Sequence, residues 1–159
     1  MKKLLIILSV LFTIAANARE VIVNSVVDGL DTDVGTLRWA ITNAVANDII
    51  IIDVKGEIVL NSSIEFPVSN VTVIGPYAKH TNIRAGSANM HFFRIDSKAG
   101  IKFIGLGFKN SVNARVGLIT NSTNISFKSC VFENNTFNGA GILFFDASSF
   151  KIENCSFIG

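Results

Sequence analysis

A short sequence motif, called the repeated phrase below, recurs along the second half of this chain. Its copies begin at Ile101, Ile125 and Phe150, so the step is 24 and then 25 residues, and a weaker copy begins at Val71. Within each copy apolar residues alternate with polar ones, which is the period of a strand with one buried face. A repeat of this length predicts a solenoid, in which each unit buries its apolar face only against its neighbours.

Each repeat has room for three short strands. A corner residue splits every copy into two strands, and a third apolar segment precedes the copy. The expected corners are Gly105, Ser129 and Asn154, and the preceding strands are expected at residues 91–95, 117–120 and 141–145. We therefore expect an all-β fold, a right-handed parallel β-helix, because three strands in about 24 residues describe one coil of such a solenoid.

Parallel stacking places equivalent residues of successive coils about 4.8 Å apart. The repeat therefore predicts files of like side chains, with Lys109 over Glu133 as an outward pair of opposite charge. The expected structural ladders are Phe108, Phe132 and Phe157 in the core, Cys130 with Cys155 in the core, and Asn110 with Asn134 at a turn.

The two cysteines allow two interpretations. Two thiols are too few for a disulfide framework, but Cys130 and Cys155 lie one coil apart and a bond or redox site is one possibility. Neighbouring parallel strands point both side chains the same way, which opposes the dihedral angle that a disulfide prefers. We therefore expect two unbonded thiols packed as small apolar groups.

The first residues have the pattern of a secretory signal peptide. Lys2 and Lys3 precede an apolar run, Leu4–Ile14, and Ala16 and Ala18 form an A-x-A cleavage motif. The run is shorter than the roughly 20 residues of a membrane-spanning helix. We expect residues 1–18 to be removed, with no transmembrane span afterwards, and the rest to be secreted or held at the outer membrane or cell surface of a bacterium.

Charge excludes one class of partner. Without Lys2 and Lys3 the basic and acidic residues both number 12, so the mature chain has no formal net charge. The sequence also has no Lys/Arg cluster of the kind that neutralises a phosphate backbone. We expect no nucleic-acid partner.

Residues 19–48 are expected to form a cap. A strand is predicted from Val21 to Val27, followed by an amphipathic helix of about three turns with Thr36 as its N-cap. The residues assigned to this cap are Leu37, Trp39, Ala40, Ile41, Ala44 and Val45. Such a helix would cover the open apolar end of a solenoid whose coils occupy residues 49–159.

The segment from Gly35 to Ile41, with Asp48 before an apolar strand, resembles the opening of bacterial secreted right-handed β-helix proteins. The group includes surface proteins similar to polymorphic outer membrane proteins, whose F-x-x-N and G-G-A-[ILV] repeats correspond here to Phe132–Asn135 and to an imperfect Gly139–Ile142. Trp39 stands where that group usually has Glu or Gln. The resemblance implies export, a β-helix fold and an adhesin-like role.

Three functions remain open at this stage. We favour an adhesin-like binding module for glycans or host cell-surface ligands; the alternatives are a fragment of a polysaccharide lyase or glycoside hydrolase and a structural spacer without a ligand. The repeat positions contain no column of outward carboxylates, so we assign no catalytic residue and do not favour an enzyme.

Metal and cofactor sites are not expected. Asp28, Asp31 and Asp33 cluster before the helix, but their spacing lacks the rest of a calcium loop, and turn chemistry accounts for them. His80 and His91 stand apart from any second ligand.

The last phrase stops at Gly159, earlier than its partner. We expect further β-helix coils in a longer chain, or a truncated product.

Overall fold

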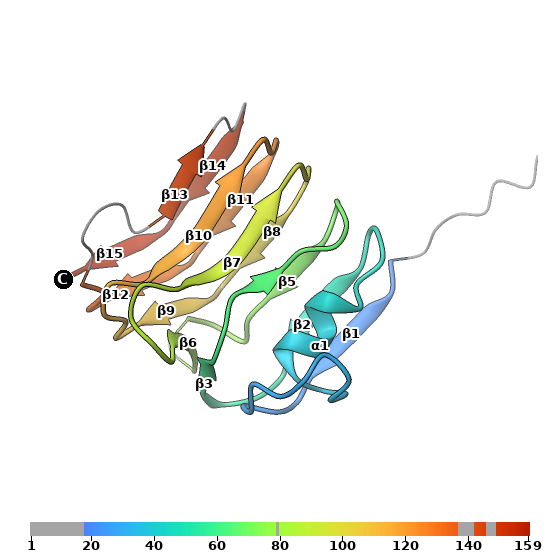
Figure 1. Cartoon of the computed structure of the whole chain (residues 1–159), viewed down its shortest axis with the longest axis horizontal. Coiled ribbons are helices and arrows are strands. Elements are labelled where there is room, and N and C mark those ends of the chain that lie inside the picture. The colour runs from blue at the N-terminus through green and yellow to red at the C-terminus, as the bar shows by residue number, and fades with distance from the viewer. Residues whose placement is uncertain (1–17, 79, 137–141, 146–148) are drawn as a thin grey trace, which may run out of the picture.

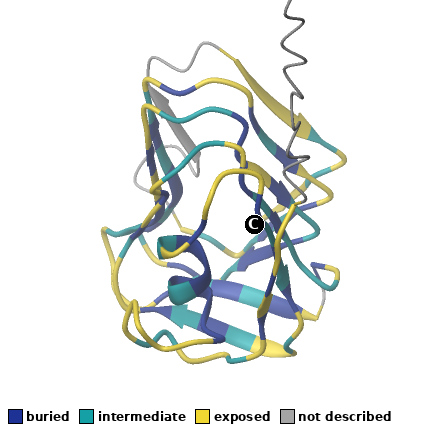
Figure 2. Ribbon diagram, turned by 90° about the vertical axis from the view of Figure 1, so that its right-hand side faces the viewer, coloured by how far each residue is buried: buried dark blue, intermediate teal, exposed yellow. Residues whose placement is uncertain are grey.

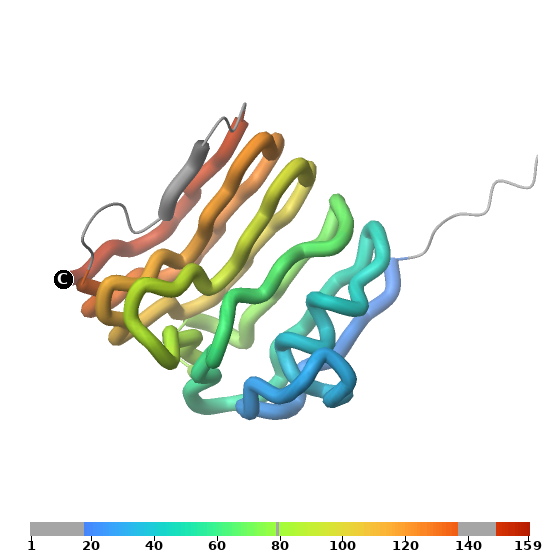
Figure 3. The backbone as a smooth tube through the Cα atoms, in the orientation of Figure 1, coloured from blue at the N-terminus to red at the C-terminus, as the bar shows by residue number. Residues whose placement is uncertain are grey.

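The computed structural model describes residues 18–78, 80–136, 142–145 and 149–159, with backbone only at 142–145. Ala16 of the expected cleavage motif, and Gly139, Ala140 and Gly141 of the expected repeat motif, lie outside these ranges. The described chain is a parallel β-solenoid of about five coils with one short helix (Figures 1 and 3).

Three parallel sheets form the walls of the solenoid. Sheet A has the strand order β1 (Glu20–Val23), β2 (Ile49–Ile52), β5 (Thr72–Ile74), β8 (Lys102–Ile104), β11 (Ile125–Lys128), β14 (Phe150–Glu153). Sheet B has the order β3 (Gly56–Leu60), β6 (Thr81–Ala85), β9 (Gly107–Lys109), β12 (Val131–Glu133), β15 (Ser156–Ile158). Sheet C has the order β4 (Ile64–Glu65), β7 (His91–Asp96), β10 (Arg115–Thr120), β13 (Ile142–Phe145). Each complete coil therefore contributes one strand to each sheet, as the repeat predicts.

The register confirms the predicted core file of phenylalanines. Phe108 pairs with Phe132, and Phe132 pairs with Phe157, across β9, β12 and β15. The stacked rings of Phe108 and Phe132 have centroids 5.2 Å apart, and those of Phe132 and Phe157 are 4.7 Å apart. A second file joins Phe103 to Phe127 at 4.8 Å. The interior is thus a continuous stack of apolar side chains, and buried residues recur in every wall of the solenoid (dark blue in Figure 2).

Burial decreases at the last described coil. Phe157 is 63% exposed and Ile158 is 51% exposed, whereas Phe108 is fully buried. The files that begin inside the solenoid therefore reach solvent at β14 and β15.

Asparagines hold many of the corners. Asn110, Asn134 and Asn154 have φ angles of 54°, 51° and 51°, in the left-handed region that asparagine tolerates better than most residues. Asn110 donates its backbone N–H to Glu133 at 3.0 Å in the next coil. Among the described residues no hydrogen bond joins the side-chain amides of Asn110 and Asn134, so these two corners stack through the backbone.

Helix α1 (Leu37–Thr42) contacts β1, β2 and β4 and lies over the end of the solenoid that Figure 2 faces. Thr36 caps it as predicted, because its hydroxyl accepts a hydrogen bond from Trp39 N–H at 3.1 Å. Leu37, Ala40 and Ile41 are buried against the core, and Trp39 packs at its edge.

Two predicted boundaries in this region are wrong. The helix ends at Thr42, not after three turns, and Val45 is 53% exposed, although Ala44 is buried. The chain turns there because the Asp48 carboxylate accepts a hydrogen bond from Val45 N–H at 2.8 Å. The predicted strand Val21–Val27 ends at Val23, because Asn24 N–H and Ser25 N–H both donate to Gly35 O.

No helix among the described residues has the length and apolar character needed to cross a bilayer.

Candidate functional site

The outer face of sheet C carries a groove of about 530 Å³. Its polar lining comes from three successive coils: Glu65, Arg94, Asp96, Lys98, Thr120 and Asn121. We call this surface the sheet C groove. Two further hollows, of about 510 and 500 Å³, continue it past Phe66 and Lys98 toward α1 and the loop before the helix.

Strand alternation places the polar side chains. In β7 the side chains of Arg94 and Asp96 point outward, and Ile95 between them is 1% exposed. The parallel register sets Arg94 opposite Glu65 of β4, and Asp96 opposite Thr120 of β10. The groove is thus built by neighbouring coils rather than by one loop.

Asp96 is the best-anchored carboxylate of the groove. Its Oδ1 accepts hydrogen bonds from Thr120 Oγ1 at 2.6 Å and from Asn121 Nδ2 at 3.4 Å. These bonds, the one from Thr120 first, lower the pKa of Asp96, and the nearby Lys98 charge adds to the effect. The carboxylate is therefore held ionised as an acceptor and is a poor proton donor at neutral pH.

The cationic groups of the groove are less constrained. Arg94 Nε lies 3.7 Å from Glu65 Oε1, with both side chains more than half exposed. Within the described part of the chain, Lys98 forms no ion pair. Arg94 and Lys98 can therefore reorient toward a ligand at small cost, because exposed ion pairs of this kind contribute little.

His91 stands at the other end of β7, opposite Arg115 of β10. Partial burial lowers the pKa of His91, and the charges of Arg115 and Arg94 lower it further. The imidazole is therefore mostly neutral near pH 7. It can donate or accept a hydrogen bond on sheet C without adding another positive charge.

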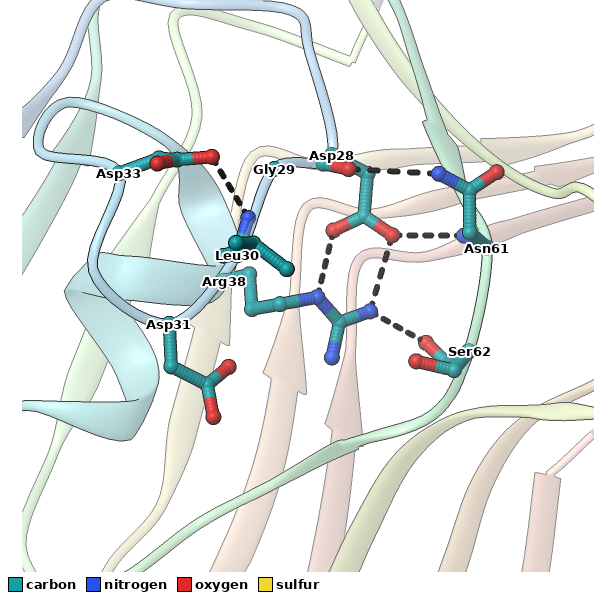
Figure 4. Close-up of a pocket in the computed structure, with 8 residues that line it drawn as sticks. All are labelled: Asp28, Gly29, Leu30, Asp31, Asp33, Arg38, Asn61 and Ser62. Atoms are coloured by element: carbon teal, nitrogen blue, oxygen red, sulfur yellow. Dashed lines mark hydrogen bonds and ion pairs between the residues drawn. The ribbon is translucent and has the colours of Figure 1, made fainter.

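The hollow next to α1 is a structural joint. Arg38 Nε and Nη2 bind the two Asp28 carboxylate oxygens at 2.8 and 2.9 Å, and Arg38 Nη2 also donates to Ser62 O at 2.7 Å (Figure 4). Asp28 Oδ2 accepts a further bond from Asn61 N–H at 2.6 Å. Both side chains are buried with their bonding capacity largely used, so this pair fastens the cap to the first coil.

The other two aspartates of the expected turn behave as turn residues. Asp33 Oδ2 accepts a bond from Leu30 N–H at 2.7 Å, and Asp31 O accepts one from Asn43 Nδ2 at 2.9 Å. Over the described ranges no group of three His, Cys, Asp or Glu residues is placed to hold a metal ion, and His80 and His91 are not brought together with other ligands.

The two cysteines are free thiols. Cys130 is fully buried, and Cys155 is partly buried in the next coil. Cys130 Sγ lies 3.6 Å from Phe103 O, and Cys155 Sγ lies 3.5 Å from Phe127 O, which is the equivalent position one coil on. Each thiol thus repeats one contact to the preceding coil, and Cys155 lies close enough to Cys130 to help raise the pKa of the Cys130 thiol, after burial.

The sheet C groove was missed by sequence reasoning. The repeated phrase forms sheets A and B, so the outward files that it defines do not include sheet C. The segments that precede the phrase carry the signal: Arg94 and Asp96 alternate with buried residues in β7, and Leu118 and Thr120 do so in β10. Extending the 24-residue step to these strands brings the two pairs together.

Comparison with known proteins identifies no relative. No family model matches the chain, and no curated protein or solved structure is significantly similar to it. What is established is the parallel β-solenoid itself.

Proposed function

We propose that this protein is an exported, right-handed β-solenoid of adhesin type that binds a polar ligand, such as a cell-surface glycan, in the sheet C groove. Export is supported by the basic start, the apolar run and the A-x-A motif at Ala16–Ala18. The resemblance of the segment Gly35–Ile41 to secreted bacterial surface proteins supports the same role.

One observation carries the proposed binding role. Along the sheet C groove two carboxylates, an amide, a hydroxyl and two cations are spread over three coils, from Glu65 to Asn121. A polyhydroxylated chain needs such a series of donors and acceptors, because each of its hydroxyls both gives and accepts hydrogen bonds. Leu118, which is partly exposed, adds apolar surface on which a sugar ring can rest.

A glycan array probed with the purified protein tests the proposal. Arg94→Ala and Asp96→Ala should each weaken binding by about tenfold to a hundredfold, since a hydrogen bond to a charged group contributes roughly 1.5–3 kcal/mol. Lys55→Ala is the matched control, because Lys55 is exposed in the turn between β2 and β3, away from the groove. Silence on the array, or binding that both groove variants leave intact, would favour a spacer or a different surface.

A carbohydrate-active enzyme is the second candidate. The observation that favours it is that two carboxylates, Glu65 and Asp96, line one groove together with Arg94 and Lys98. An assay of chain cleavage on polygalacturonate and neutral glycans, with and without calcium, decides between the two. If the protein cleaves a glycan and Asp96→Asn abolishes the cleavage, the protein is an enzyme. Binding without cleavage supports the adhesin-like binding module.

A further inference from the structure

The outer face of sheet A carries an apolar strip. In β2 all four residues are isoleucine: Ile50 and Ile52 point into the core, while Ile49 and Ile51 face outward and are partly exposed. A sheet face that is open to water usually carries polar residues, and continuous apolar runs are typical of strands covered on both faces. Strand β2 therefore has the composition of a strand with a second layer over it.

The register extends this strip over four strands. Ile22, Ile51, Ile74 and Ile104 pair in succession across β1, β2, β5 and β8, and Ile49 lies beside them. We call these five residues the isoleucine strip. The next two positions of the same file are Lys128 and Glu153, so the strip ends at β8.

In the neighbouring file a charge stands at each end of the stretch over these four strands, and the file continues beyond it to Ser126 and Lys151. That file reads Glu20, Ile49, Thr72 and Lys102 across the same four strands. Glu20 and Lys102 are both exposed, and neither forms an ion pair within the described part of the chain. The acidic group is at the first strand and the basic group at the fourth, with apolar or neutral residues between them.

We propose that two copies of this protein pair sheet A against sheet A, isoleucine strip on isoleucine strip. The two copies are related by a twofold axis that runs parallel to the strands, between β2 and β5. This rotation reverses the order of the coils, so β2 of one copy faces β5 of the other and β1 faces β8. Positions along the strands are kept, so each file faces the same file of the second copy. Ile51 then faces Ile74 of the second copy, and Ile22 faces Ile104. By the same operation Glu20 faces Lys102, so each copy supplies the other's missing ion-pair partner.

The pairing leaves the sheet C groove open. Phe93 of β7 stacks on Phe103 of β8 at 5.0 Å, so sheets A and C face each other across the core, and their outer faces point away from one another (Figure 1). Five isoleucines make a small patch by the standard of stable interfaces. The dimer is accordingly a weak, reversible one, and it presents two grooves on opposite sides.

Sedimentation equilibrium of the purified protein over a wide concentration range tests the pairing. We expect a monomer–dimer equilibrium in which Glu20→Lys or Lys102→Glu raises the dissociation constant about tenfold, because each substitution acts at two symmetry-related contacts. The double variant, Glu20→Lys with Lys102→Glu, should return the constant close to that of the unmodified protein. Both positions are exposed, so the variants leave the core intact.

Lys55→Glu changes the charge equally but lies off sheet A, and it should leave the dissociation constant unchanged. Ile51→Ser should abolish the dimer, with circular dichroism showing that the fold is kept. A monomer at all concentrations, or a dimer in which the double reversal restores nothing, overturns the proposal. Binding to lipid vesicles through Ile51 in a protein that stays monomeric would also overturn it, since the strip would then serve a membrane surface. None of these outcomes depends on whether the sheet C groove binds a glycan.

Discussion

The Arg38 guanidinium binds both carboxylate oxygens of Asp28, at 2.8 and 2.9 Å, and the two side chains are only 11% and 1% exposed. The pair joins the helix that covers the end of the solenoid to the loop that precedes it. Through Ser62 O and Asn61 N–H it also reaches the first coil. The end cap is therefore held by polar contacts as well as by its apolar face.

Removing one partner of this pair should destabilise the protein. Arg38→Met leaves the Asp28 carboxylate buried without its counter-charge, so we expect the free energy of unfolding to fall by about 3 kcal/mol. Urea denaturation followed by circular dichroism measures the change. Arg94→Met is the matched control, because the Arg94 pair is exposed and should cost less than about 1 kcal/mol. Equal effects of the two substitutions would contradict a structural role for the buried pair.

Asn135 ties two coils together, and its loss should also be costly. Its Nδ2 donates to Phe108 O at 2.7 Å, and its Oδ1 accepts from Ser111 N–H at 3.1 Å. Asn135→Ala removes both bonds and leaves the Ser111 N–H without this acceptor, so the free energy of unfolding should fall by about 2 kcal/mol. Ser126→Ala, on the outer face of β11, should change it by less than about 0.5 kcal/mol in the same urea titration. An unchanged free energy of unfolding in Asn135→Ala would show that water replaces the side-chain amide.

Much of the fold could be predicted because parallel stacking converts a step in sequence into a position in space. A constant step of 24 or 25 residues places Phe108, Phe132 and Phe157 in one file, whatever the loops between them do. The end of α1 could not be predicted in this way. The apolar spacing continues to Val45, but the Asp48 carboxylate turns the chain, and that contact belongs to the tertiary structure.

The candidate site was harder to foresee for a related reason. Glu65 and Arg94 lie 3.7 Å apart, but they are separated by a coil longer than the regular step, so an alignment of the repeated phrase does not pair them. Asp28 and Arg38 are both visible in the sequence, yet their pairing depends on how the loop between them folds back over the first coil.

Gly107 allows two coils to approach closely, and a methyl group there should not fit. A Cβ at this position would lie 2.6 Å from Ala78 O and 2.7 Å from Asn82 Oδ1. Because a backbone oxygen is one of the two atoms, Gly107→Ala should lower the free energy of unfolding by about 2 kcal/mol. The control is Gly159→Ala, because a Cβ at Gly159 has no neighbouring atom within 4 Å. The measurement is the melting temperature of each variant in a thermal unfolding experiment. Equal melting temperatures would refute the close contact.

The Cys130 thiol should make stability depend on pH in the alkaline range. Burial raises the pKa of Cys130 to about 12, against roughly 8.5 for an exposed thiol. The folded protein therefore keeps this proton while the unfolded chain loses it. The thiol contributes no pH dependence below about pH 8.5, and stability falls as the pH rises from there toward 12.

At pH 10 the loss amounts to about 2 kcal/mol, because each pH unit above the unfolded pKa of roughly 8.5 costs about 1.4 kcal/mol until the folded pKa is reached. Urea titrations at pH 7 and pH 10 should show this loss in the unmodified protein and lack it in Cys130→Ala, whose overall stability is lower at both pH values. Iodoacetamide gives an independent measurement: at pH 8 it should modify Cys155, which is partly exposed, well before it reaches Cys130. Equal rates of alkylation, or the same pH dependence in Cys130→Ala, would mean that the Cys130 thiol is not sealed in the core.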